Sequence, residues 1–127
     1  SIAKQYAVRF PRDYEKFFQF FDGKEFPEIV IYSVNDTIHP SMTIDAANRG
    51  GRSSNTGMFF IAADAFEEYG FRLSDLKKAR KTGKCPVYRY YHETGDVEKV
   101  ADSFYDFVRY SATRNPLRST KTLFEKL

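Results

Sequence analysis

The amino-acid sequence predicts an α+β globular domain, and three stretches carry this prediction. Residues 10–23 and 96–110 place apolar side chains at helical spacing, in steps of three and four. Residues 58–63 form a short run that is apolar on both faces, which is typical of a buried strand near the centre of a sheet. The chain has 127 residues, the size of one ordinary domain with one core, so we assign residues 1–127 to a single domain.

The strongest pattern lies between Val87 and Tyr110. The run Val-Tyr-Arg-Tyr-Tyr predicts a strand, and the polar turn that follows it ends at Gly95. Asp96 occupies the N-cap position of the predicted helix, where its carboxylate can accept from free backbone amides. The apolar stripe of this helix consists of Val97, Val100, Ala101, Phe104, Phe107 and Val108. We expect the two phenylalanines of the stripe to be buried.

A second clear helix is predicted over residues 10–23. Pro11 suits the first helical turn, and Gly23 is placed to end the helix. Its apolar side chains, which recur at positions i, i+3, i+4 and i+7, are Tyr14, Phe17, Phe18 and Phe21. Residues 28–34 are rich in β-branched side chains and predict a strand.

The remaining stretches have weaker patterns. Residues 48–57 have the Gly, Ser and Asn composition of a flexible loop, and they lack the Gly-Lys-Ser/Thr ending of a phosphate-binding loop. Short helices are predicted over residues 64–69, closed by Gly70, and over residues 74–81, with Ser74 as N-cap. A connector over residues 111–119 and a last helix over residues 120–127 complete the chain.

Composition limits the function classes. The chain has 20 basic and 17 acidic residues, and the resulting net charge of +3 is mild for a dedicated nucleic-acid binder. A single cysteine, Cys85, cannot form an internal disulfide, which favours a reducing compartment. No run has the length of a membrane-spanning helix, and the N-terminus lacks the apolar core of a secretory signal. We therefore expect a cytoplasmic protein that does not contact a membrane.

The basic residues cluster before the Val87 strand. Residues 72–84 contain one acidic residue, Asp75, and six basic residues, which are Arg72, Lys77, Lys78, Arg80, Lys81 and Lys84. Such a run is most often a solvated surface, because lysine needs no partner in water. The alternative interpretation is the working surface of a nucleic-acid-associated module.

Two segments of the chain resemble conserved motifs of one known family. Phe10-Pro-Arg-Asp-Tyr-Glu-Lys-Phe-Phe-Gln-Phe-Phe-Asp-Gly resembles the early helix of the SUKH superfamily. Cys85-Pro-Val-Tyr, followed by Ala101-Asp-Ser-Phe-Tyr-Asp-Phe-Val, resembles the closing strand and helix of that superfamily. The chain departs from the family pattern at Phe10, which replaces a leucine, and at Asp22, which replaces an asparagine. It also lacks a Gly-Asp-rich segment after the Met58 strand and has a basic insertion before Pro86.

The resemblance implies a single SUKH-like domain with a mostly antiparallel, curved sheet flanked by helices. It also implies a non-enzymatic binding protein. Bacterial members of the superfamily are typically immunity proteins that neutralise polymorphic toxins, often nucleases, and other members are regulators or interaction modules. The family motif carries no catalytic residues, so none is transferred to this chain.

The sequence itself contains no convincing catalytic set. His39 and His92 lie in polar surroundings, and a lone exposed histidine is far more often a surface residue than a general base. A nucleophilic pair of Cys85 with His92 is the weakest interpretation. We expect no catalytic residue, no cofactor and no bound metal.

Two functional hypotheses remain. The first is an immunity protein that occludes a bacterial polymorphic or contact-dependent toxin acting in the cytoplasm. The second is a nucleic-acid-associated or regulatory interaction module, which would use the basic segment 72–84 and the basic tail Arg109, Arg114, Arg118 and Lys121. The predicted partner-binding residues are Tyr88, Tyr90, Tyr91, Arg72, Lys77, Lys78, Arg80 and Lys81. Because like charges slow association, the first hypothesis requires either an acidic contact face on the toxin or a cluster of the acidic groups of this chain.

Overall fold

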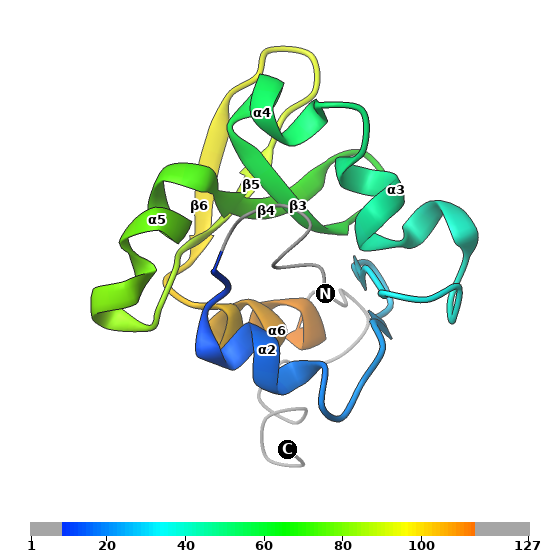
Figure 1. Ribbon diagram of the computed structural model, residues 1–127. Helices are drawn as coiled ribbons and strands as arrows, with labels where there is room; N and C mark the ends of the chain where they lie inside the picture. Colours follow the sequence, from blue (N-terminus) through cyan, green and yellow to red (C-terminus); the bar gives the residue numbers. More distant parts are fainter. Residues whose placement is uncertain (1–8, 114–127) are drawn as a thin grey trace.

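Six strands form one open sheet in the computed structural model, which describes residues 9–113 apart from the side chains of residues 79–82. The strands are β1 (Lys24–Glu25), β2 (Val30–Ile31), β3 (Met58–Ala63), β4 (Glu68–Arg72), β5 (Val87–Tyr90) and β6 (Val97–Ala101). Their order in the sheet is their order in the chain, and each neighbouring pair is antiparallel. This arrangement confirms the predicted α+β class, with an antiparallel sheet flanked by helices (Figure 1).

Helices lie on both sides of the sheet, as Figure 1 shows. The described helices are α2 (Arg12–Phe17), η1 (Pro40–Met42), α3 (Ile44–Asn48), α4 (Arg52–Thr56), α5 (Leu73–Thr82) and α6 (Phe104–Thr113). The two helices α2 and α6 pack together against one face, which we call the inner face. The short helices α3 and α4 pack against β3 on the opposite face, which we call the outer face. Helix α5 follows β4 directly and packs beside that strand.

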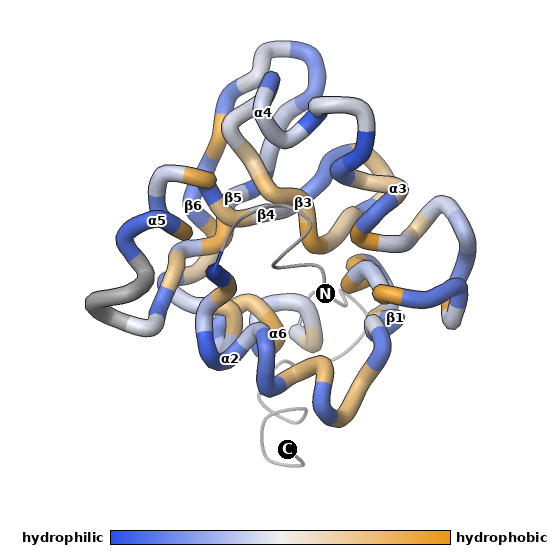
Figure 2. The backbone as a smooth tube through the Cα atoms, in the orientation of Figure 1, coloured by the Kyte–Doolittle hydropathy of each residue, from blue (hydrophilic) through white to orange (hydrophobic). Residues whose placement is uncertain are grey.

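An aromatic core lies between the inner face and helices α2 and α6. Figure 2 shows hydrophobic backbone positions on β3 and α6, on either side of this core. The Tyr14 ring meets the rings of Phe71 and Phe104 edge-on, at centroid distances of 5.3 and 4.8 Å. The rings of Tyr69 and Phe107 lie 5.2 Å apart. Phe104 and Phe107 are buried, as predicted. Aromatic burial therefore holds both helices on β4.

The predicted helix over residues 96–110 is wrong in its first half, which forms β6 and pairs with β5. Helix α6 begins only at Phe104. Its cap is Ser103 rather than Asp96, because the Ser103 hydroxyl accepts from the backbone amide of Asp106 at 3.1 Å. The apolar spacing of this stretch fits a helix, but long-range pairing with β5 decides the structure of its first half.

The predicted short helix over residues 64–69 is also wrong. The Asp64 carboxylate accepts from the amides two and three residues later, at 2.9 and 2.7 Å, and this turn leads into strand β4. Gly70 does not close a helix but lies inside β4. A Cβ atom at this position would stand 2.3 Å from the carbonyl oxygen of Phe59 on β3, so the two strands can approach closely only because residue 70 is glycine.

Residues 48–57, which we expected to form a flexible loop, contain the end of α3 and all of α4. The connection between these helices uses Gly50 and Gly51, both at positive φ. Helices α3 and α4 have 5 residues each, which is too short for a helix to be stable alone, so they rely on packing against β3.

Other predicted elements differ mainly in length. Strand 58–63 is confirmed in full and lies in the interior of the sheet, third in order. The first helix, predicted over residues 10–23, covers only Arg12–Phe17, and the strand predicted over residues 28–34 covers Val30–Ile31. Helix α5 begins one residue before Ser74, its predicted N-cap.

The end of the chain is only partly described. Residues 111–113, predicted as connector, belong to α6, whereas the rest of the connector and the helix over 120–127 lie outside the described residues. Among the described helices, none combines the length and the apolar character needed to cross a membrane.

Candidate partner-binding face

The outer face carries the side chains that alternate with the buried aromatic residues of the sheet. In β4, Glu68 pairs with Tyr90 of β5, and Gly70 pairs with Tyr88. Because side chains alternate along a strand, Arg72 lies on this same face. Helices α3 and α4 cover the face over β3, but Tyr88 and Tyr90 are only half-buried and Arg72 is exposed. The face is therefore covered on one side and accessible over β4, β5 and β6.

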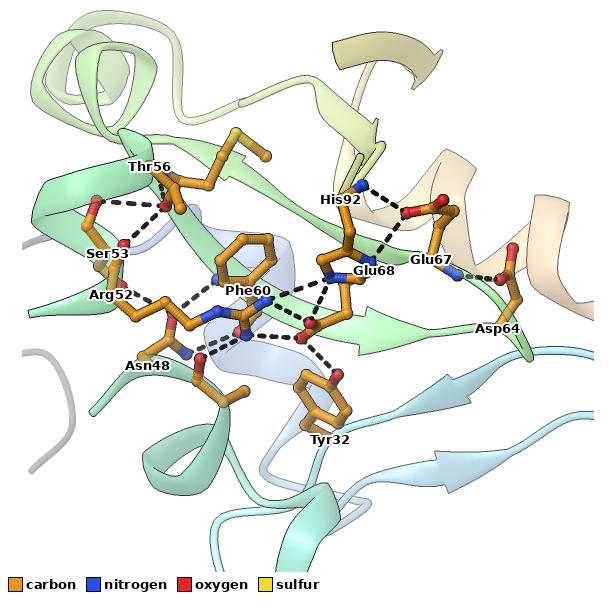
Figure 3. A network of polar contacts seen from close by, with 12 residues as sticks. Tyr32, Asn48, Arg52, Ser53, Thr56, Phe60, Asp64, Glu67, Glu68 and His92 are labelled. Atoms are coloured by element: carbon orange, nitrogen blue, oxygen red, sulfur yellow. Dashed lines mark hydrogen bonds and ion pairs between the residues drawn. The ribbon is translucent and has the colours of Figure 1, made fainter. Parts of the chain in front are cut away.

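Where the covered part ends, the Glu68 carboxylate organises a polar network (Figure 3). Arg52 donates to both carboxylate oxygens, at 2.5 and 3.1 Å, and the Tyr32 hydroxyl donates at 2.6 Å. His92 Nε2 lies 3.0 Å from Glu68 Oε1, while its Nδ1 lies 2.9 Å from a carboxylate oxygen of Glu67. Residues from four separate parts of the chain thus meet at one carboxylate.

Both terminal nitrogens of the Arg52 guanidinium are engaged by the protein. Besides its bonds to Glu68, it donates to the Ala47 carbonyl oxygen at 2.9 Å and lies 4.1 Å from the centroid of the Phe60 ring. Asn48 ties the same helices to β3, because its amide donates to the Phe60 carbonyl oxygen and accepts from the Phe60 amide. These contacts fix α3 and α4 against β3 and β4, beside the accessible part of the outer face.

The network favours the ionised form of Glu68. Burial opposes ionisation, but hydrogen bonds from Arg52, Tyr32 and His92 outweigh it and hold the pKa of Glu68 below its ordinary value. The same balance applies to Asp64, where burial is outweighed by hydrogen bonds from backbone amides and the Tyr69 hydroxyl and by the charge of Arg89. Both carboxylates therefore bind a proton less readily in the folded state than in the unfolded chain.

We expect this linkage to destabilise the protein in acid. A carboxylate with a lowered pKa contributes stability above its unfolded pKa, and that contribution is lost as pH falls through the lower folded pKa. The melting temperature should therefore fall as the pH drops from 6 to below about 4. The variant Glu68→Gln should start from a lower melting temperature and lose less of it over that range. Parallel slopes for the two proteins would contradict a contribution from Glu68.

The accessible half contains a stacked pair of different character. The guanidinium carbon of Arg72 lies 4.2 Å from the centroid of the Tyr88 ring. Lys99 of β6 pairs across the strand with Tyr88, and its ammonium lies 2.8 Å from Asp102 in an exposed ion pair. Half-buried Val97 pairs with Tyr90 on the same side. Aromatic, apolar and cationic groups thus share one surface.

The structure brings together only some of the predicted partner-binding residues. Arg72, Tyr88 and Tyr90 share the outer face. Tyr91 follows Tyr90 directly, so it points to the opposite face, where its ring contacts Arg89. Lys77 and Lys78 are exposed on α5, and the side chains of Arg80 and Lys81 are not described. Within the predicted basic tail, Arg109 lies on α6 near the Tyr105 ring, and the other three residues fall outside the described range.

Sequence reasoning missed four residues of this face, which are Arg52, Glu68, His92 and Lys99. A usable signal exists for one element, because residues 68–72 alternate aromatic side chains with polar or small ones, as a strand does.

The structure also separates the two groups of the Cys85 and His92 pair, which lie beyond opposite ends of β5. The thiol is buried and donates to the Asp75 carbonyl oxygen, and burial raises its pKa to about 11.

An antiparallel sheet with helices on both faces, and with half of its outer face accessible, defines a small α+β domain of the kind expected from the sequence. The chain belongs to the SMI1 / KNR4 family (SUKH-1), whose model matches residues 1–110. This match confirms the resemblance to the SUKH superfamily and supports an immunity-protein-like domain. No curated protein and no solved structure gave a significant match to the chain.

Proposed function

We propose that the protein is a non-enzymatic immunity protein that binds and neutralises a bacterial polymorphic or contact-dependent toxin in the cytoplasm. Membership of the SUKH-1 family supports a binding role. The observation that carries the proposal is the accessible outer face, where Arg72, Tyr88 and Tyr90 lie together. Arginine and tyrosine are the residue types that most often dominate the energy of protein interfaces.

The outer face is suited to inhibition by occlusion. Tyr88 and Tyr90 lie on a strand paired on both sides, so little side-chain or backbone freedom is lost when a partner covers them. The Glu68 network holds α4 beside this surface and limits its movement. A stable complex needs about 800 Å² from each partner, and neutralisation by occlusion requires no bond to be made or broken.

Co-expression with the toxin tests the proposed function. The probe is a toxin domain encoded immediately upstream of the gene for this chain, expressed in a bacterium with and without the full-length protein. We expect the wild-type chain to restore growth and to co-purify with the toxin domain in a stoichiometric complex. The exposed-face variant Arg49→Gln, at the turn between α3 and α4, should protect equally well and serves as a control. Failure of the wild-type chain to protect or to bind would reject the proposed function.

Binding of nucleic acid is the second candidate function. The stacked Arg72 and Tyr88 pair and the exposed Lys77 and Lys78 favour it, because stacking surfaces and cations are the two components of such sites. The hairpin between β5 and β6 opposes it, since exposed Glu93 would repel a nearby phosphate backbone. We therefore keep it as the alternative, and a titration of the full chain with a DNA duplex tests it: tight, salt-dependent binding that is lost on neutralising Lys77 and Lys78 would favour it over a protein partner.

A further inference from the structure

We propose that Arg72 and Tyr88 form a carboxylate-recognition site that holds an aspartate or glutamate side chain of an acidic protein segment. This inference rests on the proposed function, because it names the chemistry by which the protein partner is held. Beyond the proposed function, the inference specifies where on the outer face the partner binds and that the partner carries a negative charge at that point.

The stacked geometry prepares Arg72 for a carboxylate. A guanidinium that lies over an aromatic ring keeps the N–H groups at its edge available, and those groups match the two oxygens of a carboxylate. Within residues 9–113, Arg72 makes no ion pair, although Asp75 lies only three residues further along the chain. Tyr88 is held in β5 between two paired strands, so the ring under the guanidinium has a fixed position. The receptor therefore exists before the partner arrives.

Lys99 supplies a second cation at the same place. Lys99 lies on β6, where it pairs with Tyr88 of β5, and Arg72 lies on β4 at the other side of β5. The ion-pair partner of Lys99, Asp102, is 77% exposed, and such ion pairs contribute little to stability. A carboxylate of the partner can therefore replace Asp102 at low energetic cost. Arg52 differs from both cations, because Glu68 already occupies its guanidinium.

The distribution of charge favours a protein carboxylate over a nucleic-acid phosphate. Exposed Glu93 and Asp96 occupy the β5–β6 hairpin, and Glu67 and Glu68 lie beside it. Double-stranded DNA carries about one negative charge per 1.7 Å of its axis, so a duplex lying along β5 would meet these carboxylates as well as Arg72. A protein surface can present one acidic side chain to Arg72 and neutral or basic groups to the hairpin. The mixed pattern therefore fits an acidic anchor in a protein partner.

A titration of the isotopically labelled full chain tests the site. The probe is a hexaglutamate peptide, and the readout is the NMR shift of the Arg72 side-chain N–H and of the Tyr88 and Lys99 amides. We expect saturable shifts at these three residues with an affinity in the millimolar range, and none with a hexalysine peptide. Arg72→Gln should weaken the binding about tenfold, as loss of a charged hydrogen-bonding group does. Arg49→Gln removes the same charge from another exposed site and should bind like the wild type.

Each other outcome overturns the inference. Equal peptide binding by the Arg72→Gln and wild-type chains, or shifts centred on other residues, would exclude this site. A DNA duplex that binds at the same residues more tightly than the peptide would assign the site to phosphate. If Arg72→Gln fails to fold, the variant Arg72→Lys tests the same site. It keeps the charge but loses the planar guanidinium fork, so it should bind the peptide several-fold more weakly than the wild type.

Co-expression with the toxin domain separates this inference from the proposed function. If the wild-type and Arg72→Gln chains both protect fully, the function stands and the carboxylate site is not what holds the toxin. If the wild-type chain does not protect, the function fails, and the peptide titration alone decides the site.

Discussion

Glu68→Ala is expected to lower the free energy of unfolding by about 3 kcal/mol, a large share of the stability of a small domain. The substitution removes the acceptor of the Tyr32 hydroxyl, which is buried, and the carboxylate that faces Arg52. The Tyr32 hydroxyl then remains buried without an acceptor, and an unpaired buried polar group costs more than its hydrogen bond contributes. The Arg52 side chain, which is 32% exposed, loses its ion pair and keeps its hydrogen bond to the Ala47 carbonyl oxygen. Urea denaturation followed by circular dichroism measures the difference.

A second ion pair provides the matched control. Asp45 lies 3.6 Å from Arg49, and both side chains are largely exposed. Asp45→Ala should therefore change the free energy of unfolding by no more than about 0.5 kcal/mol. Equal effects of the Asp45 and Glu68 substitutions would mean that the network around Glu68 has no special structural role.

Sequence reasoning succeeds for elements whose pattern is local. Residues 58–63 are apolar on both faces, and this alone indicates an interior strand, which the structure confirms. It fails where two structures share the same local chemistry. Asp64 accepts from the amides two and three residues later, as a helix N-cap does, yet here the chain turns into a strand. Likewise Val97, Val100 and Ala101 have helical spacing but belong to a strand, because β5 lies beside them.

The candidate site shows the same limit. Arg72 and Tyr88 were predicted as partner-binding residues on separate grounds, one from the basic run and one from the tyrosine-rich strand, and the pairing of β4 with β5 places them in contact. The Glu68 network has no such signal. Arg52, Glu68 and His92 are far apart in the sequence, and only the packing of α4 and the register of the sheet bring them together. Contacts of this kind follow from the fold and cannot be read from spacing.

The aromatic core provides the largest expected effect of a single substitution. Phe104 lies at the start of α6 with an exposed fraction of 1%, and its ring centroid is 4.8 Å from that of Tyr14 and 5.3 Å from that of Phe17. Helix α2 has six residues and is too short to be stable alone, so these contacts with α6 hold it in place. Phe104 therefore links both inner-face helices.

Phe104→Ala should lower the free energy of unfolding by about 3–5 kcal/mol, because it leaves a cavity between α2, α6 and β4. The neighbouring substitution Tyr105→Ala is the control, since Tyr105 lies on the same helix with 63% of its surface exposed and should cost no more than about 0.5 kcal/mol. The urea midpoints of the two variants separate loss of core packing from a general loss of helix stability, provided that the two variants unfold with the same dependence of free energy on urea concentration. Similar midpoints for both variants would show that α6 does not hold the core together through Phe104.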